Sequence, residues 1–281
     1  MDLGRVGVWS WLPADDLAPA TEAAAELEGL GYGAFWFPES PASFEIARAL
    51  LAGTSRMVVA TGIVSIWKHT PAESAAAHRE LTAAHPGRFL LGLGVSHAFL
   101  TDGQYTRPLA RMREYLDGLD GAEPPVPAAE RVLAALGPRM LELARDRSAG
   151  AHPYLVTPEH TRRAREVLGA GSLLAVEQAA VLETDPERAR SLARRHLTIY
   201  LQAPNYTNNW LRLGFTEDDL AGGGSDRLVD ALVAWGDAGA IRERVARHHE
   251  AGADHVCVQV VTGEFRAPLE EWRALAPALG L

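Results

Sequence analysis

Phe89-Leu90-Leu91-Gly92-Leu93-Gly94-Val95-Ser96-His97 is a short apolar run that passes through two glycines and ends on Ser-His. The run is too short for a buried helix and is bounded by glycine, so it predicts a fully buried strand. Gly92 and Gly94 carry no side chain, which lets another group approach the backbone closely where the strand ends. The segment therefore predicts a buried strand that delivers His97 to a ligand.

Strand-like and helix-like segments alternate along the rest of the chain. Most of the strand-like segments are short and apolar, as expected where helices cover both faces of a parallel sheet. Three helix starts combine a capping residue with a proline at the first helical position: Thr70-Pro71, Thr157-Pro158 and Asp185-Pro186. The predicted strands are 5–9, 33–37, 57–63, 88–93, 131–136, 150–155, 173–182 and 254–261.

Eight strand–helix units in 281 residues predict an α/β fold, the (β/α)8 or TIM barrel, built as a single domain over residues 1–281. The alternative is an open, doubly wound parallel sheet. Residues 203–224 do not fit a minimal barrel, because they form a polar, aromatic and glycine-rich insertion. Long insertions of this kind tend to be functional, so we expect a lid or an interface there.

Composition argues against several classes of partner. The chain has 36 acidic and 27 basic residues and a net charge of −9, whereas nucleic acids and anionic membranes select basic surfaces. It has no run of 18 apolar residues and no signal-peptide pattern at its start. Cys257 lies between two valines, which indicates a packed strand residue. We expect a cytoplasmic protein that acts on a small molecule.

The candidate site lies where the predicted strands end, because barrels carry function at the carboxyl ends of their strands. The residues there are aromatic or small, with few carboxylates. A metal-dependent hydrolase needs early histidine ligands, a glycosidase needs two facing carboxylates and an α/β-hydrolase needs a Gly-x-Ser-x-Gly elbow; none of these patterns is evident. We therefore expect no metal and a cavity for a flat conjugated cofactor that supplies redox chemistry.

The segment Gly137-Pro138-Arg139-Met140 predicts a phosphate site. A predicted strand ends before Gly137, and Pro138 begins a helix whose first N–H groups attract anions. Arg139 adds a charge-assisted contact. The alternative is an ordinary tight turn between a strand and a helix.

Together these motifs resemble the bacterial luciferase-like superfamily of flavin- and deazaflavin-dependent oxidoreductases, and within it the actinobacterial branch of F420-dependent enzymes. The resemblance spans most of the chain. It is carried by GYGAFWFPE at 31–39, TGIVSIW at 61–67, GRFLLGLGVSH at 87–97, ALGPRML at 135–141 and GADHV at 252–256.

The resemblance implies a barrel with the cofactor ring at the carboxyl ends of the strands. It implies that Gly62-Ile63 is a non-proline cis peptide forming a bulge behind the ring. It also implies backbone contacts to the cofactor at Val95 and Ser96. The phosphate-binding turn corresponds to residues 136–140.

Two positions distinguish this chain from its relatives. His97 stands where a deazaflavin-dependent sugar-phosphate dehydrogenase of the superfamily places a proton-donating glutamate. Many relatives carry Asp-His at the end of the second strand, where this chain has Glu39-Ser40. The histidine base of that dehydrogenase is therefore missing at this position, and its substrate is not implied here.

The catalytic candidates are His97 and Glu39. An imidazole gives or takes a proton near neutral pH as hydride moves, although His97 could instead form a structural hydrogen bond. For Glu39 the alternative is a helix cap or a salt bridge. The cofactor-binding candidates are Trp9, Glu39, Thr61, Gly62, Ile63, Ser65, Val95, Ser96, Leu136, Gly137, Pro138, Arg139 and Met140. The substrate-binding candidates are Trp11, Trp67, His152 and Tyr154.

Three functions compete at this stage. The first is an F420-dependent oxidoreductase that transfers a hydride between the deazaflavin and a small organic substrate. The second is an FMN-dependent monooxygenase, in which reduced flavin reacts with oxygen. The third is a barrel that binds a cofactor without turnover. Family likeness and the aromatic insertion around Tyr206 and Trp210, expected to be exposed, also favour a homodimer. His248-His249 is predicted to lie on a helix surface.

Overall fold

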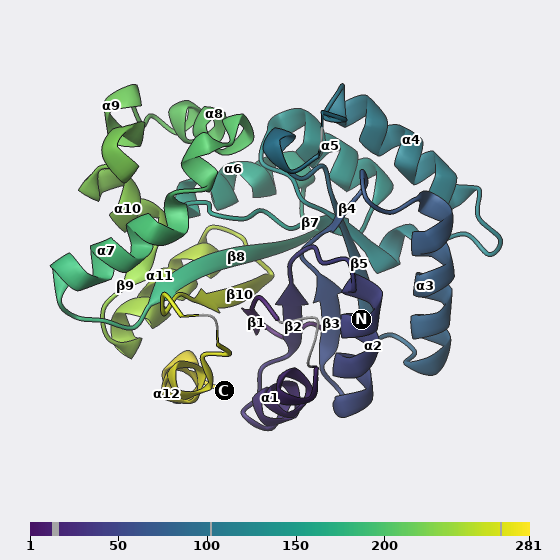
Figure 1. Ribbon diagram of the computed structural model, residues 1–281, viewed down its shortest axis with the longest axis horizontal. Helices are drawn as coiled ribbons and strands as arrows, with labels where there is room; N and C mark the ends of the chain where they lie inside the picture. Colours follow the sequence, from purple (N-terminus) through teal and green to yellow (C-terminus); the bar gives the residue numbers. More distant parts are fainter. Residues whose placement is uncertain (13–16, 102, 265) are drawn as a thin grey trace.

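A closed ring of parallel strands forms the centre of the computed structural model, which describes residues 1–12, 17–101, 103–264 and 266–281 (Figure 1). The ring strands are β1 (Val6–Trp9), β2 (Ala34–Phe37), β3 (Val58–Thr61), β5 (Phe89–Gly94), β6 (Arg131–Leu133), β7 (Gly150–Ala151), β8 (Leu173–Val181) and β10 (His255–Val260). Successive strands pair in parallel, and β10 pairs with both β8 and β1, which closes the ring. The predicted (β/α)8 barrel is confirmed, and the open sheet is excluded.

Helices cover the outside of the barrel. They include α1 (Ala18–Gly29), α2 (Ser43–Gly53), α3 (Pro71–Ala84), α4 (Pro108–Asp120), α5 (Pro138–Arg147), α6 (Pro158–Leu168), α7 (Pro186–Leu197), α11 (Ala238–Glu250) and α12 (Leu269–Leu279). The three predicted caps are present: the side chains of Thr70, Thr157 and Asp185 each accept a hydrogen bond from a backbone N–H three residues on. These bonds satisfy amide groups that have no partner within the helix.

Three strands end earlier than the sequence predicts. β3 stops at Thr61, and after residues 62–63 the chain returns to the sheet as β4 (Val64–Ser65), which pairs with β5. β6 and β7 contain only three and two residues. Pro153 lacks the N–H that a longer β7 would need for its ladder. The residues that follow these short strands are free to turn towards the rim of the barrel.

The longest excursion from the barrel lies between β8 and β10. After α7 it contains η3 (Tyr200–Gln202), α8 (Pro204–Arg212), α9 (Glu217–Leu220), η4 (Ala221–Gly223), α10 (Asp226–Leu232) and β9 (Ala234–Trp235). It forms the green part of Figure 1, at the upper left. β9 is a two-residue strand on the end of β8 that the sequence does not reveal. Trp210 is fully buried and donates its Nε1–H to the carbonyl of Leu155, at 3.2 Å.

The expectation that the aromatic residues of this excursion are exposed is therefore wrong for Trp210, and Tyr206 is also buried. Both side chains bind the excursion to the barrel. Cys257 is fully buried on β10, as predicted. The prediction for His248 is wrong, because its imidazole is buried between Thr161 and Gln178. Among the described residues, no helix is both long and apolar enough to cross a membrane.

Candidate active site

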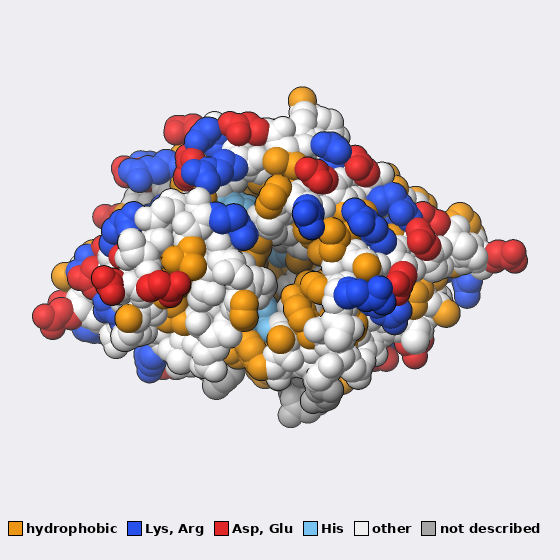
Figure 2. Space-filling view, turned by 90° about the horizontal axis from the view of Figure 1, so that it is seen from above, with side chains coloured by type: hydrophobic (Ala, Val, Ile, Leu, Met, Phe, Trp, Pro, Cys, Tyr) orange, Lys and Arg blue, Asp and Glu red, His pale blue; other side chains and the backbone are white. Residues whose placement is uncertain are grey.

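A cavity of about 640 Å³ opens at the carboxyl ends of the strands. Figure 2 shows a hollow in this face of the molecule, bordered by hydrophobic side chains, with arginine or lysine side chains near its edge. Fourteen of the predicted site residues line the cavity: Trp9, Glu39, Gly62, Ile63, Val95, Ser96, His97, Leu136, Gly137, Pro138, Arg139, Met140, His152 and Tyr154. The fold thus brings together residues from six different strand ends.

The wall of the cavity next to β3 is formed by Gly62 and Ile63. The peptide bond between them is cis, as the family resemblance implies. A Cβ atom on Gly62 would lie 2.8 Å from Nε1 of Trp9 and 2.9 Å from Nε2 of His152. Only glycine leaves room for both rings, so residue 62 controls how the indole and the imidazole approach the cavity.

The glycines of β5 make room for the protein's own chain. A Cβ on Gly92 would lie 1.8 Å from the carbonyl oxygen of Thr61, and one on Gly94 would lie 2.5 Å from Cγ1 of Ile63. The Thr61 hydroxyl also donates to the carbonyl of Gly92 and accepts from its N–H, both at 2.8 Å. The close approach predicted from the sequence is therefore made by β3 and Ile63, and it holds Ile63 against the cavity.

The turn at Gly137 forms another part of the cavity lining. Gly137 precedes α5, and no side chain caps that helix. The ring of His160 donates its Nε2–H to the carbonyl of Leu136, at 2.9 Å, and burial lowers the pKa of this imidazole to about 4. A neutral histidine thus holds the turn, while Arg139 and Arg212 line the same part of the cavity.

His97 lies between aromatic rings at the mouth of the cavity. Its ring stacks on Phe99, with 5.5 Å between centroids, and approaches the rings of Tyr200 and Tyr206. Asn205 hydrogen-bonds to the imidazole, but burial outweighs this contact and lowers the pKa of His97. Its Nδ1 atom is buried without a hydrogen-bond partner in the described part of the chain. His97 is therefore neutral near pH 7, with one nitrogen available to a ligand.

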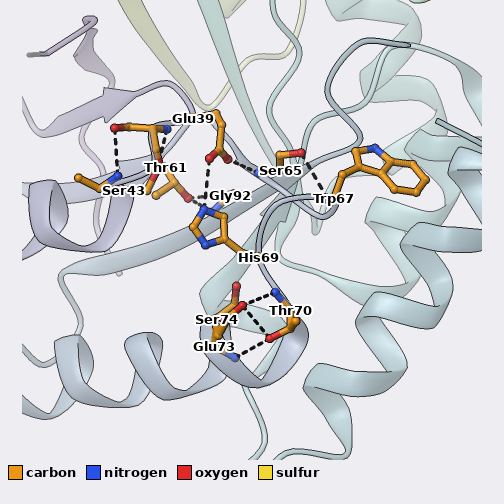
Figure 3. A network of polar contacts seen from close by, with 12 residues as sticks. Glu39, Ser43, Thr61, Ser65, Trp67, His69, Thr70, Glu73, Ser74 and Gly92 are labelled. Atoms are coloured by element: carbon orange, nitrogen blue, oxygen red, sulfur yellow. Dashed lines mark hydrogen bonds and ion pairs between the residues drawn. The ribbon is translucent and has the colours of Figure 1, made fainter. Parts of the chain in front are cut away.

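Glu39, which lines the cavity, is held by two partners (Figure 3). One carboxylate oxygen accepts the backbone N–H of Ser65, and the other lies 3.2 Å from Nε2 of His69. The carboxylate raises the pKa of His69 through this contact. His69 comes from the loop before α3 and does not line the cavity. Sequence spacing could not show this contact, because the two residues lie 30 positions apart.

Four predicted site residues lie outside the main cavity. Thr61 and Ser65 are fully buried, and the Ser65 hydroxyl accepts from the N–H of Trp67 at 3.4 Å. The Trp67 indole donates to the carbonyl of Val95, at 2.6 Å, and faces a separate cavity beside α4. Trp11 is half exposed and lines a different cavity, of about 340 Å³, with Gln259 and His196. Thr61, Ser65 and Trp67 thus support the wall from behind.

His152 and Tyr154 follow β7 and reach the cavity from beneath. His152 donates its Nδ1–H to the carbonyl of Ala175, at 2.9 Å, and burial lowers its pKa to about 4. The Tyr154 hydroxyl donates to Oε1 of Gln259 at 2.7 Å and lies 3.0 Å from the hydroxyl of Tyr200. Both side chains are thus fixed by the protein before any ligand binds.

Cavity residues in two segments, 100–109 and 199–212, were not predicted from the sequence. They are Leu100, Tyr105, Pro108, Leu109, Ile199, Tyr200, Asn205 and Arg212. The one feature of the sequence that pointed to them was the unusual composition of residues 203–224. It indicated a functional segment but did not show that this segment faces the cavity. The structure shows that η3 and α8 form one wall of the cavity. Among the described residues, no group of three or more His, Cys, Asp or Glu side chains is placed to hold a metal ion.

The family model described as luciferase-like monooxygenase matches residues 1–255. The chain belongs to that family. It is 25% identical to a protein of Mycobacterium tuberculosis (strain ATCC 25618 / H37Rv) named "Putative coenzyme F420-dependent oxidoreductase Rv3520c". That alignment covers 98% of this chain and 99% of the relative.

Solved structures with different cofactors share the fold of this family member. An F420-dependent secondary alcohol dehydrogenase in complex with an F420–acetone adduct has a TM-score of 0.75 at 15% identity, covering 98% of both chains. The F420-dependent tetrahydromethanopterin reductase of Methanopyrus kandleri has a TM-score of 0.70 at 14% identity, covering 98% of this chain and 99% of that one. The FMN complex of the oxygenating constituent of 3,6-diketocamphane monooxygenase from Pseudomonas putida has the same TM-score and identity, covering 98% of both chains.

Proposed function

We propose that this protein is an F420-dependent oxidoreductase that transfers a hydride between the deazaflavin and a small organic substrate. The observation that carries the proposal is the shape of the cavity of about 640 Å³. It has a wall at Gly62 and Ile63 against which a flat ring can lie, and a turn at Gly137 with two arginines near it. This arrangement matches a molecule with a planar ring and an anionic tail.

Unpartnered polar atoms support the fit of such a ring. Nε1 of Trp9, Nδ1 of His97 and Nε2 of His152 all belong to cavity-lining residues, are buried and have no hydrogen-bond partner in the described part of the chain. Buried polar groups of this kind usually find partners, so a ligand with heteroatoms is expected to satisfy some of them. When bound, the deazaflavin would supply the hydride chemistry, which no side chain of the cavity can perform.

The exposed position of the two arginines favours F420 over FMN. Arg139 and Arg212 are solvent-exposed at the rim and are not enclosed within the protein. A cofactor whose phosphate continues into a longer anionic tail fits an open end of this kind. The name of the Mycobacterium tuberculosis relative also favours F420. The similar solved structures include both an F420-dependent enzyme and an enzyme in complex with FMN.

The roles of the protein's own groups follow from their environment. His97 is neutral, so it accepts a proton when an alcohol is oxidised and, as the imidazolium, returns one in the reverse direction. Glu39, held by Ser65 and His69, presents a fixed carboxylate to the polar edge of the bound ring. Tyr105, Leu109 and Ile199 line the cavity with largely apolar surface, which favours a substrate that is mostly apolar.

Fluorescence titration of the purified protein with F420 and with FMN tests the assignment. We expect saturable binding of F420 and much weaker binding of FMN, followed by F420 reduction under anaerobic conditions in a panel of small alcohols. Tight FMN binding with no response to F420 would favour the monooxygenase instead. Stoichiometric F420 binding without turnover of any substrate would favour a cofactor-binding barrel that has lost its activity.

A further inference from the structure

The guanidinium of Arg212 lies beside the turn at Gly137. A Cβ atom built on Gly137 would meet only one atom within 4 Å, Nη2 of Arg212 at 3.8 Å. The guanidinium therefore lies over the open side of the turn before α5. Arg212 comes from the C-terminal end of α8, which is far from Gly137 in the sequence, and it was not among the residues predicted from the motif.

The guanidinium of Arg212 retains most of its hydrogen-bonding capacity. Its one hydrogen bond to a described residue is a long one, from Nη2 to Oδ1 of Asn209 at 3.4 Å. Neither Arg212 nor Arg139 forms an ion pair with a carboxylate anywhere in residues 1–12, 17–101, 103–264 or 266–281. By contrast, Arg162 and Arg163 on the neighbouring helix α6 both pair with Glu159. The two arginines at the cavity are thus available to an external anion.

The other end of α8 lies at His97. Asn205, in the first turn of the helix, hydrogen-bonds to the imidazole, and the ring centroid of Tyr206 is 5.4 Å from that of His97. At 1.5 Å per residue, the seven steps from Asn205 to Arg212 span about 10 Å. One helix therefore carries a polar group to His97 and another to the turn at Gly137, at a fixed separation.

We propose that Arg212 binds the phosphate of the cofactor, together with Arg139 and the turn at Gly137, and that α8 sets the distance between this phosphate and His97. A guanidinium presents paired N–H donors that match two phosphate oxygens. The inference rests on the proposed function, because it names how this same cavity recognises the anionic part of its cofactor. It assigns the contact to Arg212, a residue outside the phosphate motif that the sequence shows.

Binding measurements without any substrate test the proposal, since a phosphate on a substrate would then have no effect. The ligands are F420 and the phosphate-free deazaflavin that carries the same ring and ribityl chain. The proteins are the wild type, Arg212→Ala, Arg212→Lys and the control Arg162→Ala, which removes the same charge from an exposed position outside the cavity. Circular dichroism and thermal unfolding establish that each variant is folded.

The predicted result is selective for the phosphate. Arg212→Ala weakens F420 binding about 10- to 100-fold, the range for a charged hydrogen bond, while the affinity for the phosphate-free ring changes by less than about threefold. Arg212→Lys recovers part of the loss, and Arg162→Ala leaves both affinities unchanged. The dependence of F420 affinity on salt concentration also becomes shallower in Arg212→Ala.

Two results would overturn the inference while leaving the cofactor assignment intact. One is an equal loss of affinity for both ligands in Arg212→Ala, which would indicate a general structural role. The other is an unchanged preference for F420 over the phosphate-free ring. Failure of the wild-type protein to bind either deazaflavin would instead refute the proposed function, and this inference with it.

Discussion

His97 is the residue on which the chemistry of the proposed reaction depends. Its side chain is fixed by Asn205 and by three aromatic rings, and burial keeps it neutral by lowering its pKa. We expect His97→Ala to reduce turnover by about 10²- to 10⁴-fold, the usual contribution of a general acid or base. Steady-state kinetics and cofactor titration together measure this effect.

The same substitution is expected to change the affinity for the cofactor by only a few fold, because the phosphate end of the cavity is untouched. His85→Ala is the matched control, since His85 precedes the opposite end of the strand that leads to His97. Turnover that is unchanged in His97→Ala would refute its role in proton transfer.

Glu177 is a buried carboxyl group inside the barrel that shapes the dependence of stability on pH. Burial raises its pKa to about 8, although one of its oxygens accepts the N–H of Leu155 at 2.8 Å. Between about pH 4.5 and pH 8 the folded protein holds a proton here that the unfolded chain releases. The contribution of Glu177 to stability therefore falls as pH rises through this window, by up to about 1.4 kcal/mol per pH unit.

Glu177→Gln removes this titration. We expect the free energy of unfolding of the variant, relative to the wild type, to increase steadily from pH 5 to pH 8 in urea denaturation experiments. Glu243→Gln, an exposed carboxyl on α11, is the control. A difference between variant and wild type that is constant over this pH range would contradict the raised pKa.

At the scale of elements, the junction between β3 and β4 positions the cavity wall. Its geometry depends on Gly62, since a Cβ there would collide with the rings of Trp9 and His152. The His152 ring cannot retreat easily, because it stacks on Trp36 with 4.2 Å between centroids. The wall against which a ring can lie is thus built from β1, β3 and β7 at once.

We expect Gly62→Ala to destabilise the protein by about 1–3 kcal/mol, the usual cost of overpacking a well-filled site, and to weaken cofactor binding. Gly171→Ala is the control, because a Cβ at that position meets nothing within 4 Å. Chemical denaturation and titration measure both effects. Wild-type stability and affinity in Gly62→Ala would show that this junction does not constrain the cavity.

Elements with local signals were predictable from the sequence. Caps such as Thr70 fix where a helix begins, and apolar runs such as 89–94 identify buried strands. β9 was not predictable, because two residues carry no periodicity and their pairing depends on a strand far away in the chain. β6 and β7 begin where predicted, but the sequence did not show how early they end. The same limit applies to α8, whose direction is set by the burial of Trp210 under Leu155.

For the molecule as a whole, family likeness and the physical properties of the sequence both predicted the barrel, which the structure confirms, and both predicted a phosphate site at residues 136–140, which stays a prediction. They did not find the position of Arg212 or the contact between Glu39 and His69, since both depend on segments far apart in the chain that the fold brings together. The sequence also could not show that Thr61 and Trp67 support the cavity wall and do not line the cavity. That distinction depends on the direction of each side chain, which the sequence does not give.

We propose that one cavity holds a planar redox cofactor, with its ring at Gly62 and Ile63 and its phosphate at Gly137. The decisive measurement is a crystal structure of the protein with F420. We expect electron density for the ring against the cis peptide, with the phosphate within hydrogen-bonding distance of Arg212. Density for the cofactor only in the cavity beside Trp11, or a main cavity that remains empty at saturating F420, would contradict it.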